Sequence, residues 1–181
     1  MGNINTYLKW RGDLDFTERP FCDADNLALA LLSYLDFEGV VPDSGEEIPM
    51  PAAYEAFCQR GNGSAYRPES CERLFELMAE SKRFRTARLS HYRAIFDEER
   101  ATQFAAVTIA LGDGSVYVSY RGTDDSIIGW QEDFSIGSQV VPAQRMAADY
   151  LNEVTEGDAV YRVGGHSKGG NLSLYAAIQC G

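Results

Sequence analysis

The sequence predicts an α/β protein in which a helical N-terminal segment precedes a mixed, mainly parallel sheet flanked by helices. Helical periodicity dominates the first part of the chain, whereas apolar and β-branched residues recur at strand spacing from about residue 85. Strand-like and helix-like segments then alternate, an order typical of a parallel sheet covered by helices. We therefore expect two parts, a helical segment over residues 1–84 and a core over residues 85–181.

The N-terminal part should contain an irregular arm followed by three helices. The first helix follows Asp23 or Asp25, because a carboxylate there can accept hydrogen bonds from unpaired first-turn amides. A proline-rich loop over residues 42–51 leads to a second helix over residues 52–59, which ends at Gly61, and Pro68 opens a third. The apolar stripes of the first and third helices are Leu27, Leu31, Tyr34 and Leu35, and Leu74, Phe75 and Met78.

The core should begin with three consecutive antiparallel strands. Their residues are 87–96, 103–111 and 116–120, with a tight Gly-Asp-Gly turn before the third. A helix from Val141-Pro142 to about residue 154 follows, with Met146, Tyr150 and Leu151 facing the sheet. A strand over residues 158–163 and a helix over residues 168–179 then complete the chain, with Leu172, Leu174, Tyr175 and Ile178 as the apolar face of that helix.

Composition and charge exclude several classes of function. The 181-residue chain has a net charge of −11, which argues against binding to nucleic acid or unaided docking on anionic lipid. Its four cysteines form no CxxC pair, and only two histidines accompany them, so we expect no zinc site, no other metal and no cofactor. No signal peptide or apolar span of about 20 residues is evident. The expected location is the cytoplasm, with reduced thiols.

The residues that point to chemistry lie in the segment Tyr161 to Asn171. Gly165-x-Ser167-x-Gly169 matches a nucleophile elbow, in which a serine is held on a sharp strand-to-helix turn. Glycine is needed two residues before and after the serine, because side chains there would collide across the turn. The amide of Lys168 begins the following helix, where the helix dipole favours negative charge. Ser167 is therefore the predicted catalytic nucleophile.

A second segment ends a strand in Arg121-Gly122-Thr123 and is followed by Trp130 and Asp133. Together with the later Gly-His-Ser-Lys-Gly-Gly, it resembles the class 3 (fungal-type) lipases of the α/β-hydrolase superfamily. The N-terminal helices and the GHSKGGN elbow look more like a less characterised bacterial lipase-like branch. The resemblance covers residues 85–181 well and the first third only loosely. It implies a partial α/β-hydrolase fold.

The resemblance also implies roles for individual residues. Thr123, through its amide and hydroxyl, and the amide of Lys168 would be oxyanion donors, and Asp133 would orient Thr123. The spacing from Thr123 to Trp130 is one residue longer than in the lipases, so Asp124 or Asp125 could take the place of Asp133. The implied substrate is a small-molecule or lipid ester.

The two histidines and Lys168 are poor candidates for the general base. The side chain of His166 should leave the elbow in a different direction from Ser167, which favours packing or hydrogen bonding, and His91 lies on an early strand. A Ser–Lys dyad is disfavoured because adjacent residues on an elbow diverge. None of the residues after Ser167 is Asp, Glu or His, whereas the acid and base of this fold follow the serine in the chain.

We therefore expect a fragment of a longer serine hydrolase, inactive without its acid and base. Its last strand should leave an open edge covered by the missing half or by another chain. The alternative is a non-catalytic binding or interaction protein on a hydrolase scaffold. A weaker alternative is an anion or nucleotide site at the glycine-rich turn, although Gly170 stands where a P-loop has lysine.

Overall fold

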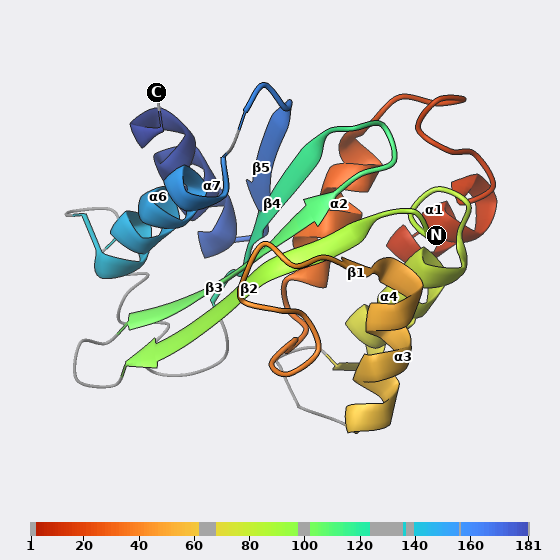
Figure 1. The fold of residues 1–181 in the computed structure, drawn as a ribbon, viewed down its shortest axis with the longest axis horizontal. Helices are drawn as coiled ribbons and strands as arrows, with labels where there is room; N and C mark the ends of the chain where they lie inside the picture. The colour runs from red at the N-terminus through yellow and green to blue at the C-terminus, as the bar shows by residue number, and fades with distance from the viewer. Residues whose placement is uncertain are drawn as a thin grey trace.

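A computed structural model describes residues 3–61, 68–97, 102–123, 136, 140–155 and 157–180. The strands form one sheet in the order β1-β2-β3-β4-β5, with helices on both faces (Figure 1). The strands are β1 (Ile48–Pro49), β2 (Arg88–Asp97), β3 (Thr102–Ala110), β4 (Val116–Tyr120) and β5 (Tyr161–Gly165). The helices are α1 (Ile4–Arg11), α2 (Asp23–Leu32), α3 (Met50–Arg60), α4 (Pro68–Glu80), α6 (Pro142–Val154) and α7 (Lys168–Gln179).

The predicted α/β class is confirmed, and so is the antiparallel pairing of β2, β3 and β4. The sheet is mixed, but the expectation of a mainly parallel sheet is wrong for the described strands. Only β4 and β5 pair in parallel, whereas β1–β2, β2–β3 and β3–β4 are antiparallel. Among the described strands, the single strand–helix–strand crossover that parallel pairing requires is the one through α6. β5 ends the strand order and pairs with β4 alone among the described residues.

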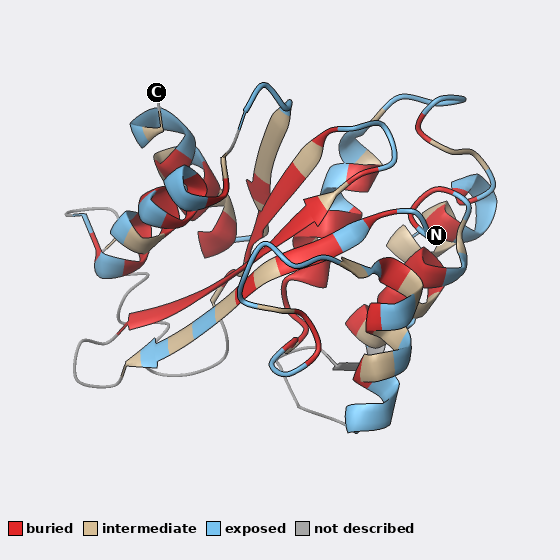
Figure 2. Ribbon diagram, viewed as in Figure 1, coloured by how far each residue is buried: buried red, intermediate tan, exposed pale blue. Residues whose placement is uncertain are grey.

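Two apolar cores lie on opposite faces of the sheet (Figure 2). One core lies between the sheet and the N-terminal helices. It contains residues of helices α1, α2, α3 and α4, of the loop after α2, and of strands β2, β3 and β4, and in it Phe37 and Phe75 are in edge-to-face contact. The other joins α6 and α7 to the sheet around Phe104, Tyr120 and Tyr150. The sheet is therefore covered on both sides, and β4 is buried along most of its length. Within the described residues, no helix is both long and apolar enough to cross a bilayer.

Several helical positions differ from the predicted apolar stripes. Leu174 and Ile178 are 63% and 69% exposed, because α7 turns Leu172 and Ala176 toward the sheet and leaves the other row outward. Leu27 on α2 is also exposed, and α2 ends before Tyr34 and Leu35, which are nevertheless buried. The predicted buried residues of α4, Leu74, Phe75 and Met78, are confirmed.

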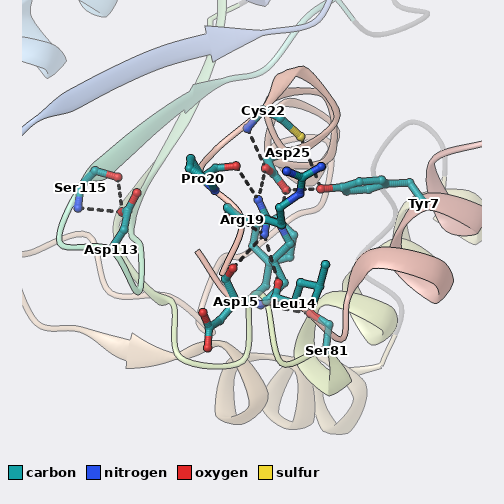
Figure 3. Close-up of polar contacts among 12 residues, drawn as sticks. Tyr7, Leu14, Asp15, Arg19, Pro20, Cys22, Asp25, Ser81, Asp113 and Ser115 are labelled. Carbon is teal, nitrogen blue, oxygen red and sulfur yellow. Dashed lines mark hydrogen bonds and ion pairs between the residues drawn. The ribbon is translucent and has the colours of Figure 1, made fainter. Parts of the chain in front are cut away.

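A buried ion pair fixes the N-terminal helices to one another (Figure 3). Arg83, which follows α4, donates from Nη2 to Asp25 Oδ2 at 2.5 Å and from Nε to Asp25 Oδ1 at 2.6 Å. Asp25 also accepts from Tyr7 Oη and from the amide of Cys22, so it closes a capping box at the start of α2. The remaining guanidinium hydrogens reach carbonyl oxygens of the arm between α1 and α2, those of Leu14, Asp15, Arg19 and Pro20.

Candidate active site

Ser167 lies between β5 and α7 with φ 58° and ψ −127°. Non-glycine residues rarely adopt such a positive φ, and each instance costs on the order of 1–3 kcal/mol unless its surroundings enforce it. His91, at a bulge in β2, is the other non-glycine residue with positive φ among those described. The side chain of Ser167 is exposed, so the strained turn presents its hydroxyl group to solvent instead of burying it.

The two glycines that flank Ser167 explain how the turn is held. A Cβ on Gly165 would lie 2.5 Å from the carbonyl oxygens of Gly169 and Tyr120, and a Cβ on Gly169 would overlap the Tyr120 carbonyl oxygen. All of these neighbours are backbone atoms, which cannot rotate away. The close approach of the elbow to the end of β4 therefore requires glycine at both positions. This agrees with the steric reason for which they were selected from the sequence.

The Arg-Gly-Thr segment after β4 lies against the elbow. A Cβ on Gly122 would lie 3.3 Å from Ser167 Cβ and would overlap Tyr34 Oη and the carbonyl oxygen of His166. The structure thus brings together the two segments that the sequence singled out, and Thr123 follows Gly122 directly. Asp133, its alternatives Asp124 and Asp125, and Trp130 lie outside the described residues.

The backbone amide and the side chain of Lys168 lie in different environments. It is the first residue of α7, so its amide lies at the positive end of the helix dipole beside Ser167. Its side chain is buried, and Nζ donates to the carbonyl oxygen of Gln103 at 3.0 Å. The ammonium group is thereby tied to the start of β3, consistent with the expectation that a Ser–Lys dyad does not form.

His166 is held by a residue that sequence reasoning did not connect with the site. Tyr34 Oη lies 3.0 Å from His166 Nδ1, and the two rings are in edge contact. Tyr34 is buried in the loop after α2 and also borders Gly122. The sequence placed Tyr34 only on an apolar helical face. The position of Tyr34 at the end of this apolar stripe was the only sign in the sequence that it could matter, and it did not indicate that His166, 132 residues away, would be its partner.

A comparison with family models gives one match, to Mbeg1-like proteins, over residues 78–181. That is more than half of the chain. The chain belongs to the Mbeg1-like family. No curated protein and no solved structure matches it.

Membership of the Mbeg1-like family corrects the resemblance drawn from the RGT and GHSKGG motifs. The matching family is distinct from the class 3 lipases and the other families of the α/β-hydrolase superfamily, and no hydrolase family matches. The assignment as a lipase-like or esterase-like member of those families is therefore wrong. Short glycine-rich motifs record a local backbone requirement, and different families can meet the same requirement.

The Mbeg1-like match contains Ser167, Thr123 and Lys168 but begins after Tyr34. It spans the end of α4, strands β2 to β5, and helices α6 and α7. Among the described residues, no group of three or more His, Cys, Asp or Glu side chains is placed to hold a metal ion. The candidate site of this Mbeg1-like chain therefore consists of a strained exposed serine, the amides beside it and the residues that pack around it.

Proposed function

We propose that Ser167 is the nucleophile of a serine hydrolase that cleaves an acyl ester. The observation that supports this proposal best is the backbone of Ser167. A non-glycine residue at φ 58° is held there by two glycines pressed against β4, while its hydroxyl remains exposed. Strain of this kind is retained where the surroundings enforce it, and it concentrates at functional sites. A serine with only a structural role would not need this conformation.

In the proposed reaction, Ser167 Oγ attacks the acyl carbonyl carbon and loses its proton to a general base. The carbonyl oxygen becomes an oxyanion, and the amides of Lys168 and Thr123 are the proposed donors to it. Each such donor contributes about 3 kcal/mol of transition-state stabilisation in enzymes of this type. Collapse of the intermediate expels the alcohol, and water then releases the acid from Ser167. Strands β4 and β5 with α7 would be the nucleophile-bearing part of a hydrolase-type core.

The proposal requires a general base, and the described hydrogen bonds of the two nearest candidates are made to residues other than Ser167. His166 Nδ1 is bonded to Tyr34, and the ammonium group of Lys168 is bonded to Gln103. Without a base, a serine hydroxyl stays protonated and is weakly nucleophilic at neutral pH. This same observation favours the second candidate function, a non-catalytic binding protein that keeps the elbow geometry without turnover.

Labelling with a fluorophosphonate tests the proposal, because this reagent forms a covalent bond only with an activated serine. The full-length protein should gain the mass of one adduct, and Ser167→Ala should gain none. Ser44→Ala is the matched control, since Ser44 is another exposed serine and lies in a loop far along the chain from the elbow. Absence of a Ser167-dependent adduct would reject the hydrolase and favour the binding protein.

A further inference from the structure

Arg121, which is half-buried, carries a buried nitrogen atom that has no hydrogen-bond partner among the described residues and lies beside the candidate nucleophile. It follows β4, and its amide donates to the carbonyl oxygen of Ala105 at 2.9 Å. Its Nε atom is buried, and no acceptor lies within hydrogen-bond distance of it among the described residues. A buried donor that lacks an acceptor destabilises the folded state, and more strongly when the group is charged. Folded proteins rarely retain such a group without a reason.

The side chain of Arg121 belongs to the face of the sheet that α2 covers. Side chains alternate along β4, and Ser119, two residues earlier, donates from Oγ to the carbonyl oxygen of Leu29 in α2. Ala105 on β3 lies between Arg121 and Ala94 on β2, because it pairs with Ala94 on one side and accepts the Arg121 amide on the other. The side chain of Arg121 therefore starts from a row in which the next two strands, β3 and β2, carry the small side chains of Ala105 and Ala94.

A cavity of about 470 Å³ opens at the far end of this row. It is lined by residues 38–43 of the loop after α2 and by Tyr92, Arg93 and Ala94 of β2. Burial raises the pKa of Tyr92 to about 12, while the charge of Arg121 acts in the opposite direction and lowers this pKa. Arg121 also starts from the same row as Ala94, which lines the cavity, so its side chain extends from the face of the sheet on which the cavity opens. The volume is within the range of small-molecule sites.

Among the described residues, the carboxylates around the cavity form no ion pair with Arg121. Asp36 accepts a hydrogen bond from Tyr92 Oη at 3.3 Å, and its other oxygen lies 3.5 Å from Arg60 Nη2. Glu38 and Asp43 are exposed on the wall of the cavity, and neither pairs with Arg121 in the described part of the chain. In a chain with net charge −11, a guanidinium group that pairs with no carboxylate of the described residues is a candidate to bind an anion from outside.

We propose that Arg121 binds an anionic group of the substrate, a carboxylate or a phosphate, between Ser167 and this cavity. This inference rests on the proposed function of Ser167 and narrows its substrates to acyl esters that carry a negative charge. Gly122 connects the two groups, since it follows Arg121 in the chain and contacts the elbow. The planar guanidinium fork suits both anions, because it can donate two parallel hydrogen bonds to either of them.

Binding to the full-length Ser167→Ala variant tests the anion site without turnover. The probes are monoethyl glutarate, its neutral counterpart diethyl glutarate, and inorganic phosphate, with affinities measured by calorimetry. We expect at least one anion to bind more tightly than diethyl glutarate, and Arg121→Gln to weaken this binding by about 10-fold or more. Arg145→Gln is the matched control, because Arg145 is exposed, forms no ion pair among the described residues and carries the same charge.

The binding measurements distinguish a carboxylate site, a phosphate site and the absence of an anion site. Tighter binding of monoethyl glutarate alone identifies a carboxylate, and binding of phosphate alone identifies a phosphate. Equal affinity for the neutral diester and both anions, or equal losses in Arg121→Gln and Arg145→Gln, would overturn the anion site. The labelling of Ser167 is measured separately. Arg121-dependent anion binding without labelling of Ser167 would reject the hydrolase proposal and support the anion site. Labelling of Ser167 without Arg121-dependent anion binding would support the hydrolase proposal and reject the anion site.

Discussion

Arg83 is buried and Arg121 is half-buried, and the two side chains differ in their hydrogen-bond partners. Arg83 forms a two-point ion pair with Asp25 and donates to four backbone carbonyl oxygens (Figure 3). Its guanidinium carbon also lies 4.3 Å from the ring centroid of Phe16. Arg121 has an unpartnered Nε at the end of β4. The difference indicates that the fold can satisfy a buried guanidinium completely where stability requires it. A buried guanidinium nitrogen that has no acceptor in the described part of the chain, beside a strained serine, is therefore better explained by a ligand than by poor packing.

The comparison predicts the largest loss of stability at Arg83. Arg83→Met removes one partner of a buried ion pair and leaves the Asp25 carboxylate uncompensated, which typically costs about 3–5 kcal/mol. The free energy of unfolding from urea titration at pH 7 measures this loss. Arg145→Gln, which removes an exposed arginine, should change it by less than about 0.5 kcal/mol. Equal values for the two variants would mean that the Asp25–Arg83 pair does not hold the helices.

The same ion pair predicts a pH dependence. Burial raises the pKa of the Asp25 carboxyl, but hydrogen bonds from Arg83, from Tyr7 and from a backbone amide outweigh burial and lower this pKa below its usual value. A depressed pKa in the folded state stabilises the protein above the unfolded-state pKa of about 3.9, and this stability is lost as the pH falls through the folded-state pKa. The stability difference between the native chain and Asp25→Asn should therefore shrink below about pH 4, as measured by urea titration at a series of pH values. A constant difference down to pH 2 would contradict this.

An intermediate effect is expected at the glycines of the elbow. A Cβ on Gly169 would overlap the backbone of Tyr120, so Gly169→Ala should cost about 1–3 kcal/mol through forced displacement of the turn. Gly45→Ala is the control, because its nearest atoms would be ring atoms of His91 at 3.6 Å, an ordinary contact. Thermal unfolding of both variants measures the difference. A Gly169→Ala protein as stable as the control would show that the turn is not constrained by β4.

A smaller effect is expected from the contact between the loop after α2 and the elbow. Tyr34→Phe removes the hydrogen bond to His166 while keeping the ring, and such a bond contributes about 0.5–1.5 kcal/mol. If Tyr34 also positions the elbow, the rate of fluorophosphonate labelling should fall more than this stability loss explains. Tyr54→Phe is the control for loss of a tyrosine hydroxyl, because the ring of Tyr54 is in edge contact with Phe75 of α4 and not with a residue of the elbow. Unchanged stability and unchanged labelling would remove Tyr34 from the site.

The smallest expected effect completes the comparison of the two arginines. Arg121→Gln should change the free energy of unfolding by less than about 0.5 kcal/mol, because the buried Nε atom of Arg121 forms no hydrogen bond with the described residues. The measurement is the same urea titration that is used for Arg83→Met. A loss above about 2 kcal/mol would mean that Arg121 has a structural partner, and the anion site would then lose its main support.

The elements that could be predicted from the sequence are those whose local signals agree. Pro68 at the start of α4, Pro142 at the start of α6 and the alternation in β3 and β4 all identify elements present in the structure. The elbow was also predictable, because the steric need for glycine around Ser167 is local. Periodicity does not reveal which apolar row of a helix is covered, so Leu174 and Ile178 were assigned to the wrong environment.

Interactions between distant parts of the chain were not predictable in the same way. Asp25 was recognised as a helix-capping residue, but nothing near it in sequence indicated that Arg83 would pair with it. Tyr34 and His166 are separated by 132 residues in sequence, and no local pattern links them. The isolated Nε of Arg121 is likewise a property of packing, since an arginine at a strand end is ordinary in sequence.

The contact of Tyr34 with the elbow has a consequence for comparing proteins that share this elbow. Tyr34 precedes residue 78, where the family match begins, yet its hydroxyl group contacts His166 and borders Gly122 beside Ser167. Two relatives could therefore keep the same matched segment and still differ in selectivity. A chimera that joins residues 78–181 to a foreign N-terminal segment would retain the turn while replacing one wall of its environment.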